Sequence, residues 1–438
     1  MTTRRDFIRT GAGAVGAGIM LPVIQPNWQP NWQPNLHQAK GATVVEMLRD
    51  DLVADDKILV VVELAGGNDP LNTIVPIQQY DTYASFRSRI AIPKDQLLPL
   101  HGSATMGLSP NLSAIKPIAD AGKFAVIQMC HYPNPNLSHD GSRTIYRLAD
   151  TSNSAVTRNG WLGRHSALFG NKTNSLDTVG IGGVNPTLYA PGAKIAGIIN
   201  DAQGNAAGYQ FRTDERYAGD RDNQLSAARV MDAAQSNKAY IDLSETTELD
   251  ALNSADSVAQ ATAAYQSSVT YPANNNFASG LKLIAKLATA NSPRLGTRVF
   301  YITQGGYDTH ADQINDQPAL HRALAEGLKA FYDDMVEHGL ADKLLIMIWS
   351  EFGRRVADNA SNGTDHGQAN NIYCIGNRVV GGTYGADPKL TDLQNGNLKN
   401  NYDFREVYST IIQSWFGNSA SDAAQILNGS FNNLGFLM

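Results

Sequence analysis

Two short segments of the sequence place an acidic residue beside a histidine. Asp308 and His310 lie two positions apart in GGYDTH, and Asp365 and His366 are adjacent in GTDHG. A carboxylate and an imidazole this close in an irregular loop can both turn toward one ion, and together they suit zinc, manganese or iron. These four residues are therefore candidate metal ligands. The alternative is that such histidines are structural or simply exposed.

Two further loops offer a carboxylate. Asp69, in the segment AGGNDPLN, could supply oxygen to a hard or borderline cation, although glycine followed by Asn-Asp is also ordinary turn chemistry. Glu351 lies in SEFGRR, which directly follows an apolar run. Three positions later, Arg354 has the planar guanidinium that can hold a tetrahedral oxyanion with two hydrogen bonds. A surface salt bridge is the alternative role for this arginine.

The segment CHYPNPNLSHD holds a candidate nucleophile. A helix is expected from about Ser142, which puts Ser138 close to its amino terminus, where free backbone N–H groups favour an anion. Ser138 could equally be a helix cap, the commonest role of serine at that position. The next residue, His139, is a further candidate metal ligand.

Short apolar runs precede most of these segments. They are rich in β-branched residues and bounded by glycine or polar residues, which is typical of strands buried on both faces. An amphipathic helix is predicted between two of them, with an apolar stripe from Leu320 to Met335. Strand, helix, strand indicates an α/β fold with a parallel sheet, whose ligands bind outside the carboxyl ends of the strands. The predicted strands are Ile58–Leu64, Phe124–Met129, Thr297–Thr303, Leu344–Trp349 and Asn371–Ile375.

The first forty residues have the form of an export signal. Arg4 and Arg5 precede a glycine-rich, weakly apolar run, and together they resemble a twin-arginine signal. The repeat QPNWQPNWQPN at 25–35 is predicted to be an extended tether. The resemblance implies recognition by the twin-arginine translocation machinery and a periplasmic or cell-surface location. The body, 41–438, is predicted to be a single α/β domain with a helical insertion at about 212–292.

The composition narrows the classes of function. The chain has a net charge of −6, and residues 1–40 are basic, so the body is more acidic still. An acidic body lacks the electrostatic footprint of a nucleic-acid-binding protein. The two cysteines, Cys130 and Cys374, are too few for a disulfide scaffold and are expected to be buried.

Six motifs occur in order from about Ile58 to Phe416: GGND, SH before a helix, GGYDTH, SEFGRR, GTDHG and DFREVY. Together they resemble the exported bacterial family named domain of unknown function 1501. That family is grouped by fold with alkaline phosphatases, sulfatases and cofactor-independent phosphoglycerate mutases. The resemblance implies a three-layer sandwich with a mostly parallel, alkaline-phosphatase-like sheet and a helical insertion.

The resemblance also implies roles for the candidate residues. Asp69 matches the first metal-binding aspartate of the superfamily, and Ser138 loosely matches its nucleophile. Glu351 lies where an Asp-His pair is expected, with Phe352 in place of the histidine. The remaining metal motifs are matched by Asp308, His310, Asp365 and His366.

The predicted function is that of an exported metal-dependent hydrolase of phosphate or sulfate esters. The divalent metal could be zinc, manganese or calcium, because one expected imidazole is missing. The alternative is a non-catalytic exported protein of the same fold that binds a metal or a surface polymer.

Overall fold

The computed structural model describes residues 57–152, 159–172, 174–201, 203–207, 254, 257–290 and 295–438. The predicted signal and tether, and much of the predicted insertion, lie outside these ranges. From Asp56 onward the chain forms one compact unit. Within the described ranges, no helix combines the length and the apolarity needed to cross a membrane.

A ten-stranded mixed sheet forms the centre of this unit. Its order is β14-β5-β13-β10-β1-β9-β6-β7-β8, and β15 also pairs with β5. The five neighbours from β10 to β7 all run parallel. The strands are β1 Ile58–Leu64, β5 Phe124–His131, β6 Thr178–Ile181, β7 Ile195–Asn200, β8 Ala206–Ala207, β9 Val299–Gln304, β10 Leu344–Trp349, β13 Asn370–Ile375, β14 Gly382–Tyr384 and β15 Tyr402–Asp403.

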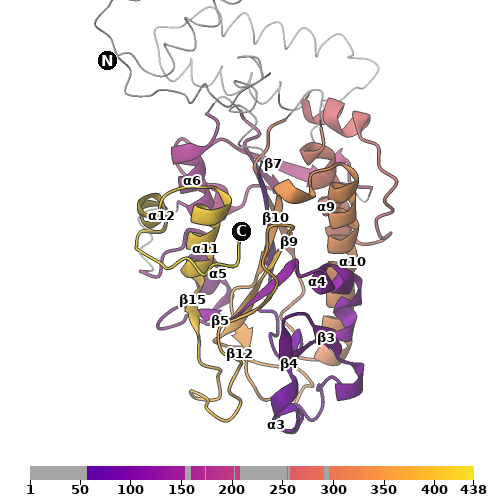
Figure 1. Cartoon of the computed structure of the whole chain (residues 1–438), viewed down its shortest axis with the longest axis vertical. Coiled ribbons are helices and arrows are strands. Elements are labelled where there is room, and N and C mark those ends of the chain that lie inside the picture. Colours follow the sequence, from indigo (N-terminus) through magenta and orange to yellow (C-terminus); the bar gives the residue numbers. More distant parts are fainter. Residues whose placement is uncertain are drawn as a thin grey trace, which may run out of the picture. The chain divides into compact units, whose positions relative to one another are not determined.

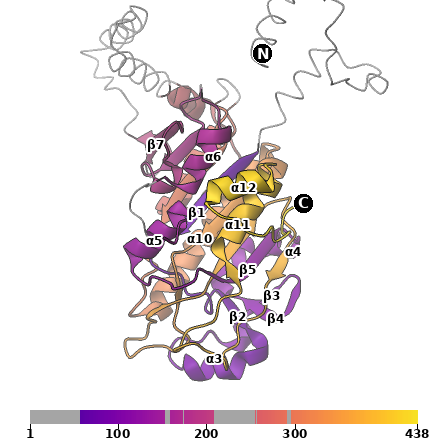
Figure 2. The same cartoon turned by 90° about the vertical axis from the view of Figure 1, so that its left-hand side faces the viewer.

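Helices cover both faces of the sheet (Figure 1). One layer contains α4 Lys116–Asp120, α9 Asn276–Ala288 and α10 Gln313–Glu337. The other contains α5 His139–Leu148, α6 Trp161–Phe169, α11 Phe404–Thr410 and α12 Ala420–Leu427, which Figure 2 shows from the front. Alternate residues of β1 point into the two layers: Val60 and Val62 join one apolar core, and Leu59 and Val61 join the other. The expected three-layer α/β fold with a mostly parallel sheet is thus confirmed.

A small antiparallel sheet and several short elements complete the described chain. The small sheet has the order β2-β4-β3, and another antiparallel pair, β11 with β12, joins the loop after β10 to the segment before β13. Their bounds are β2 Ile74–Pro76, β3 Leu98–Leu100, β4 Ser103–Leu108, β11 Gly353–Arg354, β12 His366–Gly367 and helix α3 Tyr80–Phe86.

The predicted strands are close to the observed ones, with one difference of direction. The first and fourth have the predicted bounds, and the others shift by one or two residues at an end. β13 runs antiparallel to β10 and to β5, so its amino end, not its carboxyl end, meets the edge at which β1, β9 and β10 finish. Strands β6 and β7 were not predicted, because glycine interrupts both short apolar runs.

The later part of the predicted insertion belongs to one helical layer of the fold. Helix α9 buries Phe277, Leu281 and Ile284 in the same apolar core as Phe300 of β9. It also packs against α10. A deletion that reaches residue 290 would therefore remove a core helix. Residues 212–253 of the predicted insertion lie outside the described ranges, and their role stays a prediction.

Candidate metal centre

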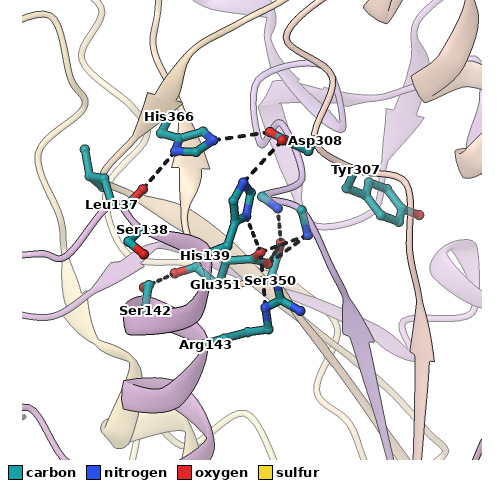
Figure 3. Close-up of polar contacts among 12 residues, drawn as sticks. Leu137, Ser138, His139, Ser142, Arg143, Tyr307, Asp308, Ser350, Glu351 and His366 are labelled. Atoms are coloured by element: carbon teal, nitrogen blue, oxygen red, sulfur yellow. Dashed lines mark hydrogen bonds and ion pairs between the residues drawn. The ribbon is translucent and has the colours of Figure 1, made fainter.

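The exit loops of β9 and β10 meet in front of the amino end of α5 (Figure 3). β9 leads into the loop that carries Asp308 and His310. β10 leads into Glu351 and, through β11 and β12, to His366. Helix α5 begins at His139, three residues earlier than predicted, so Ser138 is its N-cap residue.

Glycine is required where these loops cross. Gly66, just after β1, has a φ of +128°, and a Cβ placed there would lie 2.3 Å from the backbone nitrogen of Asp308. At Gly363 a Cβ would lie 2.3 Å from the carbonyl carbon of His310. Both distances are far below any possible contact. The glycines therefore let the loops approach one another closely enough to share one site.

Asp308 is the centre of the cluster. Its Oδ2 lies 3.2 Å from His139 Nε2, and its Oδ1 lies 3.2 Å from His310 Nε2 and 3.2 Å from His366 Nε2. Arg354 donates to Oδ1 at 2.7 Å. Partial burial alone would raise the pKa of Asp308, but the hydrogen bond and positive charge of the Arg354 guanidinium hold it well below its usual value. The carboxylate is therefore ionised at neutral pH.

Each of the three histidines is held through its other ring nitrogen. His366 Nδ1 lies 2.8 Å from the Leu137 carbonyl oxygen, which can only accept a hydrogen bond. His139 Nδ1 lies 2.9 Å from Glu351 Oε1. That carboxylate is surrounded by donors, because it also accepts from the backbone N–H of Gly66 and from the Ser350 hydroxyl. In both histidines, Nδ1 therefore carries the proton and Nε2 presents a lone pair.

His310 follows the same pattern at a more exposed position. Its Nδ1 lies 3.2 Å from Asp365 Oδ1. The hydrogen bond from Asn359 lowers the pKa of Asp365, so the carboxylate is an acceptor and His310 Nδ1 is the donor. His310 Nε2 then faces His366 Nε2 at 2.9 Å. Burial lowers the pKa of His366, which favours its neutral form.

Two nitrogen lone pairs at 2.9 Å repel each other unless a proton or a metal ion lies between them. Metal–ligand bonds of ~2.0–2.1 Å at tetrahedral angles would put ligand atoms about 3.3 Å apart. The measured separations around Asp308 are 2.9 to 3.2 Å. His139, Asp308 and His366 each offer one ligand atom within 4.8 Å of the others, and His310 adjoins two of them. The donor set fits a first-row divalent cation.

Glu351 and Asp365 therefore orient histidines. A carboxylate that fixes the tautomer of a metal-binding imidazole is a common arrangement around metals in proteins. Glu351 is completely buried, whereas the Asp365 side chain is 56% exposed. The buried Phe352 ring packs against both His139 and His366, with centroid separations of 5.0 and 4.3 Å.

Asp69 does not reach this cluster. It is 1% exposed, and both of its oxygens are taken: the Arg87 guanidinium contacts both, Gln313 Nε2 donates to Oδ2 at 2.6 Å, and the Leu71 N–H donates to Oδ1 at 3.1 Å. The structure gives Asp69 the role of a buried ion-pair partner in place of the predicted metal ligand. Arg87 lies eighteen residues away, and the sequence carries no signal that links the two.

Arg354 also differs from its predicted role. Its guanidinium is buried and donates to the carbonyl oxygens of Gly67, Tyr307 and Thr364 at 2.7 to 3.0 Å, and to Gly66 O and Asp308. These bonds tie together the loops after β1 and β9 and the segment before β12. With its donors committed to the protein, Arg354 positions Asp308 and is not free to hold an oxyanion.

Ser138 lies at the rim of the cluster, near His139 (Figure 3). Its side chain makes no capping hydrogen bond. Arg143, one helical turn after His139, was not singled out in the sequence. Its Nε lies 3.7 Å from Glu351 Oε1 and 4.0 Å from the buried Glu63. The spacing of four residues from His139, which puts both on one helix face, was the available signal.

The sequence of the chain matches the model of the family described as "Protein of unknown function (DUF1501)" over residues 130–415, more than half of its length. The chain belongs to this family. No curated protein matches it.

Solved structures similar to this DUF1501 protein include the PsFucS1 sulfatase from Pseudoalteromonas sp., at 12% identity and a TM-score of 0.36, covering 90% of this chain and 75% of that one. An alkaline phosphatase from the Antarctic bacterium TAB5 shows 7% identity and a TM-score of 0.27, covering 75% and 94%. Ps i-CgsB, in complex with k-i-k-neocarrahexaose, shows 10% identity and a TM-score of 0.34, covering 86% and 75%. At such scores the likeness says nothing about this protein's activity.

Proposed function

We propose that this protein is a metal-dependent hydrolase of phosphate or sulfate esters. The observation that carries the proposal is the convergence of three imidazole Nε2 atoms on Asp308, each ring being held through Nδ1. Three nitrogens and a carboxylate favour zinc or manganese over calcium, which prefers oxygen. The side chains of Asp308 and His310 are 46% and 44% exposed, so a substrate in solution can reach them.

The metal would supply a Lewis acid that polarises the ester and lowers the pKa of a hydroxyl or water. His139, Asp308, His310 and His366 would hold it. Glu351 and Asp365 keep two of the histidines in the ligating tautomer. The amino end of α5 presents backbone N–H groups beside the cluster, which would favour the negative charge of the ester.

Ser138 is the nucleophile that we assign, since it is exposed and its hydroxyl is not used as a cap. We further propose export through the twin-arginine route. The support is the arginine pair at positions 4 and 5, which lies outside the described residues.

The test is metal analysis combined with turnover of 4-nitrophenyl phosphate and 4-nitrophenyl sulfate. The protein as purified, and after removal and return of zinc or manganese, should show bound metal and metal-dependent hydrolysis of one ester. His366→Gln should lose metal and activity together. His101→Gln, which changes an exposed histidine outside the cluster, is the matched control and should keep both.

Two outcomes would overturn the proposal in different ways. Absence of metal after reconstitution would show that the histidines share a proton, and no metal-dependent reaction could then follow. Stoichiometric metal without turnover of either ester would favour the non-catalytic, binding role for this fold. The binding role competes with the hydrolase role because, among the described residues, no base is hydrogen-bonded to the Ser138 hydroxyl.

A further inference from the structure

A cavity lies at the same edge of the sheet as the metal cluster. It has a volume of about 550 Å³, within the ~300–1,000 Å³ of small-molecule sites. Three adjacent parallel strands, β9, β6 and β7, end at it, and their exit residues Gly305, Gly182 and Asp201 line it. Ligands of open parallel sheets bind outside such carboxyl ends.

The loop after β9 connects the cavity to the cluster. Gly305 lines the cavity, and Asp308, three residues later, is the centre of the cluster. Three residues of extended chain span at most about 11 Å. β9 lies between β6 on the cavity side and β1 on the cluster side. One substrate of modest size could therefore occupy both places.

The cavity offers uncommitted, uncharged hydrogen-bonding groups. Asn274 and Asn276 line it with exposed side chains that make no hydrogen bond with any described residue. Thr303 also lines it, but the alternation along β9 turns its side chain to the face of Tyr301, opposite to that of Ile302. Behind these groups, Ile181 and Ile302 form an apolar wall.

The described residues around the cavity do not favour an anionic occupant. Among the described residues that line it there is no lysine or arginine. The carboxylate of Asp201 is already engaged: Oδ1 accepts from the N–H groups of Gln203 and Asn205 at 2.9 and 2.7 Å, and Oδ2 accepts from Asn205 Nδ2 at 3.0 Å. Amides and an apolar wall together suit a ligand with hydroxyl groups at its edge and C–H groups on its face.

We propose that this cavity, which we call the β6–β9 pocket, binds an uncharged sugar ring and that the substrate is an anionic ester of a carbohydrate. The ring occupies the pocket, and its ester group extends along the Gly305–His310 loop to the cluster. The assignment of a substrate rests on the proposed function, whereas the binding of a neutral sugar does not.

Glycine at position 305 provides a sharp test. A Cβ at Gly305 meets no atom within 4 Å, and its φ lies outside the left-handed region, so a larger residue there should leave the fold intact. Gly305→Phe would fill the mouth of the pocket. Asn276→Leu removes one amide that lines the pocket at nearly constant volume. Ala104→Phe, which puts the same aromatic ring on the exposed face of β4, is the matched control.

The experiment measures binding of uncharged tetrasaccharides built from glucose, galactose, mannose or N-acetylglucosamine to the full-length protein by saturation-transfer NMR and calorimetry. At least one should bind at ~10 mM, a concentration that saturates even a millimolar site. Binding should be lost in Gly305→Phe, weakened about fivefold in Asn276→Leu through the loss of one hydrogen bond, and unchanged in Ala104→Phe. Metal content should be unchanged in all three variants.

The inference is overturned if none of the sugars binds, or if Gly305→Phe and Asn276→Leu bind as the unmodified protein does. Sugar binding without hydrolysis of 4-nitrophenyl phosphate or 4-nitrophenyl sulfate would contradict the proposed hydrolase and leave the pocket standing. Hydrolysis of these small esters without sugar binding would support the proposed hydrolase and contradict the sugar-binding pocket. If both hold, the sulfated or phosphorylated form of the bound sugar should be hydrolysed with a KM that rises in Gly305→Phe and stays unchanged in Ala104→Phe.

Discussion

Removal of the Arg87 guanidinium should destabilise the protein without emptying the metal site. Arg87 and Asp69 are both fully buried, and Arg87 also donates to Asn72 Oδ1 at 2.9 Å and to two backbone carbonyls at 2.9 and 3.0 Å. Arg87→Met leaves the Asp69 carboxylate in the interior with only Gln313 and the Leu71 N–H as partners. Such a change costs about 3–5 kcal/mol, because an uncompensated charge remains buried.

The loss would be a large part of a typical total stability of ~5–15 kcal/mol. Urea unfolding, followed through the fluorescence of the buried Trp161, Trp349 and Trp415, measures it. The double variant Arg87→Met with Asp69→Leu removes both charges, and it should recover most of the lost stability, since apolar replacement of a whole buried pair is often neutral.

Metal content separates this explanation from the predicted role of Asp69 as a ligand. At saturating metal, Asp69→Asn and the double variant should both bind as much metal per folded chain as the unmodified protein. Loss of metal in Asp69→Asn, with normal folding, would show that Asp69 ligates the ion. A double variant no more stable than Arg87→Met would refute the account of the buried charge.

Three further predictions follow from the site and the sequence. Ser138→Ala should abolish ester hydrolysis with metal content retained, and activity near that of the unmodified protein would show that water is the nucleophile. Replacement of Arg4 and Arg5 by lysine, which keeps the charge, should leave the protein in the cytoplasm; normal export, followed by fractionation, would contradict the twin-arginine assignment. Burial lowers the pKa of His321 from 6.5 to about 4. As pH falls, the unfolded chain therefore binds a proton at this histidine before the folded protein does, and the free energy of unfolding decreases between these two pKa values. Between pH 7 and 5 the free energy of unfolding should fall by about 2 kcal/mol through this histidine. The fall should be absent from His321→Gln when both proteins are metal-free, and equal pH dependence of their urea unfolding would contradict the role of His321.

The sequence predicted the interior of the sheet better than its margins. Ile58–Leu64 and Leu344–Trp349 are uninterrupted apolar runs with β-branched residues, and both have the predicted bounds. β6 has the sequence TVGI, and glycine also interrupts β7, so neither run shows the pattern of a buried strand. The direction of β13 could not be predicted either, because strand residues buried on both faces look the same in parallel and antiparallel pairing.

At the site, the sequence predicted which residues could bind a metal, but not which other residues they would contact. The motifs identified His139, His310 and His366, whose positions beside glycines and carboxylates indicate ligands. They could not separate Asp308, which faces the cluster, from Asp69, which is turned toward Arg87. Both follow a strand and a pair of glycines. The difference depends on a residue in another segment, and local sequence holds no information about it.

The four proposed ligands come from positions 139, 308, 310 and 366, and Arg354 joins the segments that carry the last three. No short stretch of the chain contains the site, so it cannot exist until β1, β5, β9, β10 and β13 have assembled. Contacts between segments this distant in sequence form slowly, because closing the long loops between them lowers the entropy of the chain before the contacts stabilise it. Metal capture would then be the final event of maturation, and an ion bound here would mark a chain that has completed its folding. If the protein crosses a membrane already folded, the site is complete before the crossing.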